Sequence, residues 1–105
     1  MSGSSLRLDK WLWYARFAKT RAQVQKLIER GQVSVNGVAV QKTSTGVQRG
    51  DTLAVILGPV RRTVIVRDIG ERRGPPGEAR TLYDEPAPAE RLSWEEAGAP
   101  LHPRR

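Results

Sequence analysis

Cysteine is absent from this 105-residue chain, and histidine, phenylalanine and methionine each occur once. Without cysteine there can be no thiol nucleophile, no disulfide framework and no cysteine-ligated zinc site. No apolar run approaches the roughly 20 residues that a membrane-spanning helix needs, and the first residues lack the apolar stretch of a signal peptide. We therefore expect a cytoplasmic protein that does not enter a membrane.

Residues that could form a catalytic or metal site are also scarce. The single histidine, His102, lies among prolines near the end of the sequence, where little would orient it. We find no paired carboxylates, glycine-rich phosphate loop or serine elbow at the spacing that such sites require. We therefore expect no enzymatic activity, no catalytic residue, no cofactor and no bound metal.

Positive charge is plentiful but unevenly distributed. The chain has a net charge of +7, and its pI is about 10.8. Residues 1–70 contain 12 Lys and Arg against 4 Asp and Glu, whereas residues 71–105 contain 6 against 7. Such a concentration of charge favours a polyanionic partner, most often nucleic acid bound through its phosphates. An ordinary solvated surface could have a similar charge. The sequence motifs therefore have to distinguish a nucleic-acid-binding surface from a solvated one.

The first predicted helix begins near Leu8. Asp9 then lies in the opening turn, where a carboxylate suits the positive end of the helix dipole. Leu8, Leu12 and Ala15 follow at helical spacing and predict a buried stripe, with Trp11 beside it. Two further aromatic residues, Trp13 and Tyr14, could pack in the core or stack on RNA bases, and we favour packing.

A second helix is predicted from Thr20. Thr20 and Gln23 match a capping box, in which each side chain accepts a hydrogen bond from the backbone of the other residue. Gly31 is the expected terminator, since glycine adopts the left-handed conformation without strain. The buried stripe between them consists of Val24, Leu27 and Ile28.

A β-hairpin should follow the second helix. Asn36-Gly37, the preferred pair for a type I′ turn, separates Val33–Val35 from Val38–Val40. This turn pairs Val35 with Val38 and Val33 with Val40, so all four valines share one face. Residues 41–48 are polar and predict a loop. Two later strands are expected at 52–57 and 62–69, which gives a small, mainly antiparallel sheet of about four short strands.

The fold class predicted is therefore α+β, with two N-terminal helices packed on that sheet. We expect one domain over residues 6–70. Six of the seven prolines lie between residues 75 and 103, with little apolar periodicity around them. We expect residues 71–105 to form a proline-rich, partly disordered C-terminal extension, with a helical turn over residues 78–83.

The candidate RNA-binding surface is the stretch over residues 6–40, which holds the helix pair and the hairpin. Lys19 and Arg21 flank a helix N-terminus, which favours phosphate, and neither has a nearby acid in sequence. Arg7 could instead pair with Asp9. The full set of predicted RNA-binding residues is Arg7, Lys10, Arg16, Lys19, Thr20, Arg21, Gln23, Lys26, Arg30 and Asn36.

Several of these motifs together resemble the S-four RNA-binding domain, or alpha-L motif. They are Arg7-Leu8-Asp9-Lys10-Trp11-Leu12-Trp13, Lys19-Thr20-Arg21, Gly31-Gln32-Val33 and Val35-Asn36-Gly37. Within that family, the paired tryptophans are similar to those of the heat-shock protein fifteen group. Arg72-Arg73-Gly74 and Leu82-Tyr83-Asp84-Glu85 are similar to the same group. The resemblance covers residues 6–85.

This resemblance implies binding of ribosomal RNA, and possibly tRNA, on the large ribosomal subunit. It further implies a role in recycling subunits that still carry peptidyl-tRNA after translation aborts. Two alternatives remain at this point: a DNA-binding regulator that uses the two-helix unit, and a stand-alone RNA-binding module of an RNA-modification system. We expect a monomer, since no dimerisation segment is evident.

Overall fold

The computed structural model describes residues 5–92 of the chain. The first half contains β1 (Ser5–Arg7), α1 (Leu8–Tyr14), α2 (Arg21–Glu29), β2 (Val33–Val35), β3 (Val38–Val40) and β4 (Gly46–Gln48). The second half contains β5 (Thr52–Leu57), β6 (Val60–Val66), α3 (Pro76–Ala79), a 3-10 turn, η1 (Arg80–Leu82), β7 (Tyr83–Asp84) and β8 (Glu90–Arg91). The predicted α+β class is confirmed.

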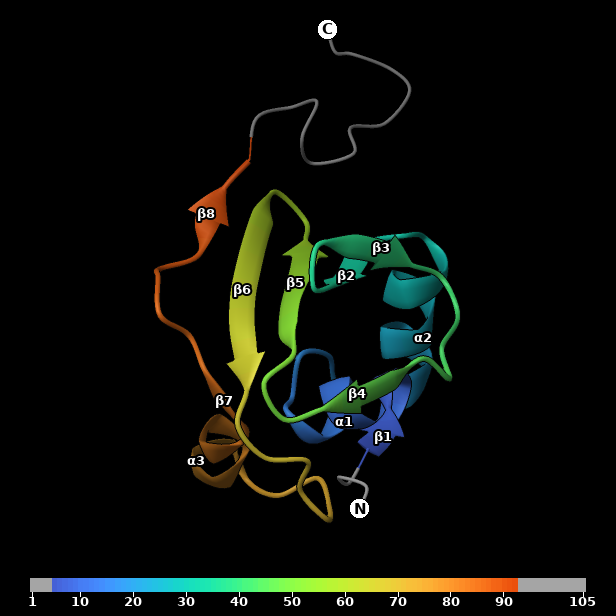
Figure 1. Cartoon of the computed structure of the whole chain (residues 1–105). Helices are drawn as coiled ribbons and strands as arrows, with labels where there is room; N and C mark the ends of the chain where they lie inside the picture. The colour runs from blue at the N-terminus through green and yellow to red at the C-terminus, as the bar shows by residue number, and fades with distance from the viewer. Residues whose placement is uncertain (1–4, 93–105) are drawn as a thin grey trace, which may run out of the picture.

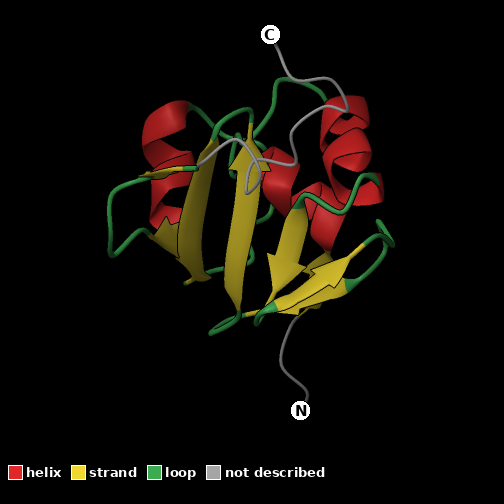
Figure 2. Cartoon of the chain, turned by 90° about the horizontal axis from the view of Figure 1, so that it is seen from above, coloured by secondary structure: helices red, strands yellow, loops and turns green. Residues whose placement is uncertain are grey.

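The main sheet is antiparallel throughout, in the order β3-β2-β5-β6-β7, and β8 pairs with β6. The helices gather on one side of these strands (Figures 1 and 2). A second, two-stranded sheet joins β1 to β4. Within residues 5–92, no helix is both long enough and apolar enough to span a membrane.

The core lies between the helix pair and the main sheet. Most of its fully buried side chains come from both helices and from three strands of the main sheet: Leu8, Trp11, Leu12, Val24, Ile28, Val33, Leu53, Val55 and Val64. The Trp11 ring also donates a hydrogen bond from Nε1 to the Asp68 carbonyl, 2.8 Å away. The apolar stripes predicted for the two helices are therefore the stripes that pack.

A buried carboxylate holds the two helices together. Asp9, in the first turn of α1, is fully buried and accepts hydrogen bonds from Arg7 and from Gln25 of α2, the latter at 2.9 Å. Arg21 Nη2 lies 3.5 Å from the same carboxylate. Burial raises the pKa of Asp9, but the hydrogen bonds from Gln25 and Arg7 and the charge of Arg21 outweigh it and hold the pKa below its ordinary value.

The hairpin has the predicted turn and register. Asn36 and Gly37 both have positive φ, 52° and 86°, as a type I′ turn requires. Val33 pairs with Val40 and Val35 with Val38. The shared valine face is only partly covered, because Val33 is fully buried whereas Val38 is 64% exposed at the tip.

Residues 41–48 are not the continuous loop that their polarity predicts. Gly46–Gln48 form β4 and pair with β1, and Val47 is fully buried. The Thr45 carbonyl also accepts a hydrogen bond from the Leu8 backbone N–H, one of the free donors at the start of α1. A single apolar residue among polar neighbours gives too weak a pattern for a strand to be predicted.

The C-terminal extension contributes to the fold. The helical turn expected over residues 78–83 is present as α3 and η1, and Leu82 belongs to the core. Further along, β7 and β8 add to β6, and Leu92 is buried. The boundary at residue 70 stays a prediction, and residues 93–105 lie outside the described part of the chain.

Gly37→Val should destabilise the hairpin by about 1–3 kcal/mol, since a β-branched residue is strained at a φ of 86°. Nothing lies within 4 Å of the Cβ that would be added, so backbone strain alone should act. Ala39→Val is the control, because it places the same side chain on β3 at an ordinary φ. Urea denaturation of both variants measures the difference, and equal stabilities would contradict the turn.

Asp9→Asn should lower the free energy of unfolding by about 2 kcal/mol at pH 7, because charge-assisted hydrogen bonds to a buried group are lost. The Asp9 pKa is depressed on folding, so this stabilisation is present above the unfolded value of about 3.9. It should disappear as the pH falls through the lower, folded value. Denaturant titrations of both proteins from pH 7 to pH 2 test this, with Glu71→Gln as an exposed control. A constant difference across that range would contradict it.

Candidate nucleic-acid interface

The predicted cations lie on the helix pair and on the segments that flank it. Figure 1 shows how α1 and α2 are arranged. Arg7 ends β1 and Lys10 is in the first turn of α1. The loop that joins the helices carries Arg16 and Lys19. The remaining three predicted cations are on or beside α2: Arg21, Lys26 and Arg30.

Two of these cations are opposed by an acid. Arg7 pairs with Asp9 at 3.1 Å, as its position in sequence suggested. Arg21 has no acid near it in sequence, but folding brings Asp9 of α1 to 3.5 Å from its guanidinium. Half of the Arg7 side chain and 40% of the Arg21 side chain nevertheless remain exposed. Both guanidinium groups can therefore face a ligand while they brace the helix pair.

Lys19, Lys26 and Arg30 are different, because they are exposed and form no ion pair with any residue between 5 and 92. Lys26 and Arg30 are four residues apart and line the same shallow groove of about 260 Å³. The apolar part of that groove comes from Leu27 and Leu57. Uncompensated cations beside a partly apolar groove suit an RNA strand, whose phosphates need charge and whose sugars and bases need contact surface.

Three polar residues of the predicted set have structural roles. Thr20 Oγ1 accepts from the Gln23 backbone N–H at 3.1 Å, and Gln23 Oε1 accepts from the Thr20 N–H at 3.2 Å, which completes the predicted capping box. Asn36 accepts from the Thr52 N–H and donates to Asp51, and so fastens the hairpin turn to β5. All three side chains therefore stabilise the start of α2 and the hairpin turn.

Trp13 and Tyr14 of α1 pack against the protein, which is the alternative that we favoured over stacking on RNA bases. The Tyr14 side chain is buried, with Lys10 Nζ 5.9 Å from its ring centroid. Trp13 is half-buried, and the Arg73 guanidinium lies 5.4 Å from its ring centroid. A cation over an aromatic face is attracted to the ring and covers that face. Neither ring is thus an open platform for stacking bases.

Arg73 shows that the C-terminal extension reaches the helix pair. Its guanidinium donates to the Ala18 carbonyl in the loop between α1 and α2, and Arg16 Nε donates to the Gly74 carbonyl at 2.7 Å. These reciprocal contacts fasten residues 73–74 to the candidate surface. In the sequence, only the Arg72-Arg73 pair hints at a contact between the C-terminal extension and the helix pair. The pair does not indicate which residues it contacts.

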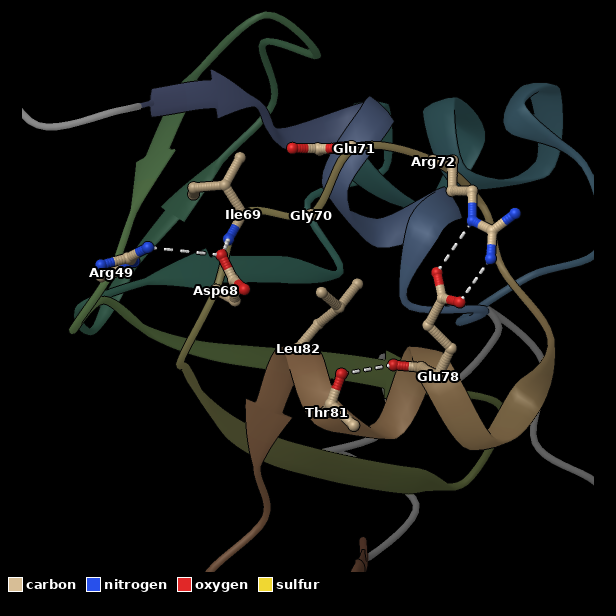
Figure 3. A pocket seen from close by; sticks show the side chains of 9 residues that line it. All are labelled: Arg49, Asp68, Ile69, Gly70, Glu71, Arg72, Glu78, Thr81 and Leu82. Carbon is tan, nitrogen blue, oxygen red and sulfur yellow. Dashed lines mark hydrogen bonds and ion pairs between the residues drawn. The ribbon is translucent and has the colours of Figure 1, made fainter.

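Another cavity of the described chain lies elsewhere and is poorly suited to phosphate. Figure 3 shows this space of about 490 Å³, with Ile69 and Leu82 among the residues that line it. Each arginine at its edge is already paired, Arg49 with Asp68 at 3.5 Å and Arg72 with Glu78 at 2.7 Å (Figure 3). With Glu71 added, the lining carries one more acid than base. The helix pair, in contrast, carries cations that have no acidic partner within residues 5–92.

Comparison with known proteins identifies the family of the segment that contains the candidate surface. The S4 domain matches residues 6–53, which span both helices and the hairpin. Heat shock protein 15 of Escherichia coli K12 is 50% identical over 82 residues, which are 78% of this chain and 61% of that protein. The RQC P-site tRNA stabilizing factor of Halalkalibacterium halodurans is 37% identical over 75% of this chain and 88% of its own length.

A solved structure agrees with the fold. The trimeric structure of Vibrio cholerae heat shock protein 15 superposes with a TM-score of 0.75 at 39% identity, covering 80% of this chain and 84% of that one. The present chain spans about three fifths of the length of the curated heat shock protein 15 relatives that it matches. Sequence motifs, fold and topology thus agree, and the chain belongs to the S4-domain family of heat shock protein 15.

Proposed function

We propose that this protein binds structured RNA, ribosomal RNA or tRNA, on the large ribosomal subunit through the α1–α2 surface. The observation that carries the proposal is the set of exposed cations on α2 and its preceding loop, Lys19, Lys26 and Arg30, which no acid of the described chain neutralises. Arg7 and Arg21, held by Asp9, add two pre-oriented guanidinium groups beside them. Preformed cations lose little side-chain entropy on binding.

The biological setting that we propose derives from the relatives. One group is named for heat shock and another for stabilising a P-site tRNA in RQC. We infer a rescue or recycling role, in the cytoplasm, on subunits that carry peptidyl-tRNA after translation aborts. The action is binding and not catalysis, because the surface offers phosphate-binding cations and its polar side chains serve as caps.

Contacts from these cations to phosphates should position the RNA without reading its sequence. Recognition would then depend on the shape of the RNA and on the fixed angle between α1 and α2. The uncompensated lysines set the strength of binding, while the Asp9 network sets the geometry. Arg21→Ala should change both the strength of binding and the geometry of the helix pair. It therefore cannot separate the two effects.

Lys19→Ala and Lys26→Ala should each weaken binding to ribosomal subunits and to model RNA hairpins by similar factors. Each should reduce the slope of log K against log salt by about one, since one phosphate contact is lost. Titrations at several salt concentrations measure this. Arg91→Ala is the matched control, because Arg91 is also exposed and unpaired within residues 5–92 but lies on β8.

Two outcomes would contradict the proposal. If the Lys19, Lys26 double variant bound RNA like the parent at every salt concentration, the interface would lie elsewhere on the molecule. If the parent preferred duplex DNA to structured RNA of equal length, the class of ligand would be wrong. Equal losses in the Arg91→Ala control would mean that only total charge matters.

The expected monomeric state stays a prediction, and the Vibrio cholerae relative is described as trimeric. Light scattering over a tenfold or greater range of concentration should give a single mass near 11.7 kDa for this chain. A mass that rises with concentration toward three times this value would show self-association.

A further inference from the structure

A second, smaller pocket of about 210 Å³ lies between the end of α1 and the segment that forms α3, η1 and β7. Three arginines line it, Arg16, Arg62 and Arg80, together with Tyr83. No carboxylate is among its lining residues. Two of the arginines and the tyrosine come from beyond residue 53, where the S4 match ends.

Arg62 is the best fixed of the three. Its guanidinium lies 4.6 Å from the Phe17 ring centroid and donates to both carboxylate oxygens of Glu85, at 3.0 and 2.8 Å. Nη2 also donates to the Tyr83 hydroxyl at 3.1 Å. These contacts occupy Nε and Nη2 but leave Nη1 without a partner among residues 5–92. Arg62 can therefore donate in one fixed direction.

Arg16 has an unusual backbone. Its φ is 64°, and the only other described residue besides glycine with a positive φ is Asn36 of the hairpin turn. Glycine would take this conformation without strain, so an arginine here points to a role for its side chain. Nε donates to the Gly74 carbonyl, which fixes the side chain while both terminal nitrogens remain without a partner in the described chain.

Arg80 completes the set, since it is exposed and has no ion pair or side-chain hydrogen bond within residues 5–92. Glu85 neutralises Arg62, so the pocket has a net positive charge of about two, from Arg16 and Arg80. Arg16 and Arg80 line one pocket with Arg62 and have no carboxylate partner within residues 5–92, and planar guanidinium groups match the oxygens of a phosphate group. The volume is below the roughly 300–1,000 Å³ of typical small-molecule sites, which favours a single phosphate over a whole nucleotide.

We propose that Arg16, Arg62 and Arg80 bind a backbone phosphate of the RNA, so that the interface continues from the S4 segment onto the C-terminal segment. This inference rests on the proposed function for its ligand. It explains why the loop between the helices and residues 73–74 are fastened to each other by Arg16 and Arg73. The fastening holds Arg16 and Arg80, from different parts of the chain, around one pocket.

The test uses the full chain and two probes. Arg80→Gln should reduce the salt slope of RNA binding by about one, whereas Arg91→Gln, an exposed arginine on β8, should leave it unchanged. Arg16→Gly removes a second guanidinium; it relieves the positive φ but also loses the hydrogen bond to the Gly74 carbonyl, so it should lower the slope while the circular-dichroism spectrum stays that of the folded parent. Titration with inorganic phosphate, followed by NMR of the arginine Nε–H groups, should shift Arg16 and Arg62 in the parent and less in Arg80→Gln.

The outcomes separate this pocket from the proposed function. Normal RNA binding with an unchanged slope in both Arg80→Gln and Arg16→Gly would overturn the pocket and leave the helix-pair interface standing. If the parent bound no RNA, the proposed function would be wrong. The phosphate titration alone would then show whether the pocket binds phosphate. Shifts confined to Arg16, Arg62 and their neighbours would then support a site for free phosphate. Their absence would overturn it.

Discussion

The Asp9 carboxylate is the interaction on which the arrangement of the candidate surface depends. A fully buried carboxylate lowers the stability of the fold unless its oxygens accept hydrogen bonds. Here the donors come from the strand before α1 and from α2. Satisfying Asp9 therefore requires the two helices to meet at one relative position. The same contacts hold Arg7 and Arg21, whose side chains stay 50% and 40% exposed, at fixed positions on the helix pair. One buried charge thus fixes both the arrangement of the helices and the positions of two cations.

The uneven distribution of charge along the chain has a structural explanation. The acids of the C-terminal segment neutralise arginines of the sheet and its edges: Glu90 pairs with Arg61, Glu85 with Arg62, Asp84 with Arg67 and Glu78 with Arg72. Most of these pairs are exposed and contribute little to stability. Their effect is on the electrostatic field, because they neutralise four arginines outside the helix pair, whereas Lys19, Lys26 and Arg30 on the helix pair keep their charge uncompensated within residues 5–92.

The C-terminal segment is thereby part of the candidate surface as well as of the fold. Leu82 closes the core, Tyr83 packs its ring 5.6 Å from that of Phe17, and Arg73 reaches the loop between the helices. The S4 match ends at residue 53, shortly after the hairpin. The remainder of the described chain, residues 54–92, braces the helix pair and supplies cations of its own.

Local patterns in the sequence determined the helix pair, the capping box at Thr20, the Asn36-Gly37 turn and the valine register. Each of these depends on residues within a few positions of one another, where spacing and backbone preference act directly. The same local information located the cations but not their partners. Asp9 is 12 residues from Arg21 in sequence, and Arg62 is 23 residues from Glu85.

Only the tertiary structure decided which weakly patterned segments form strands and which arginines are paired. Val47 gave no strand pattern, yet pairing with β1 buries it completely, because a short strand is stabilised by its partner and not by its own sequence. Whether a given arginine is free or neutralised likewise depends on which distant acid the fold brings beside it. The sequence therefore predicted an RNA-binding helix pair, and only the packed chain showed which of its charges remain available.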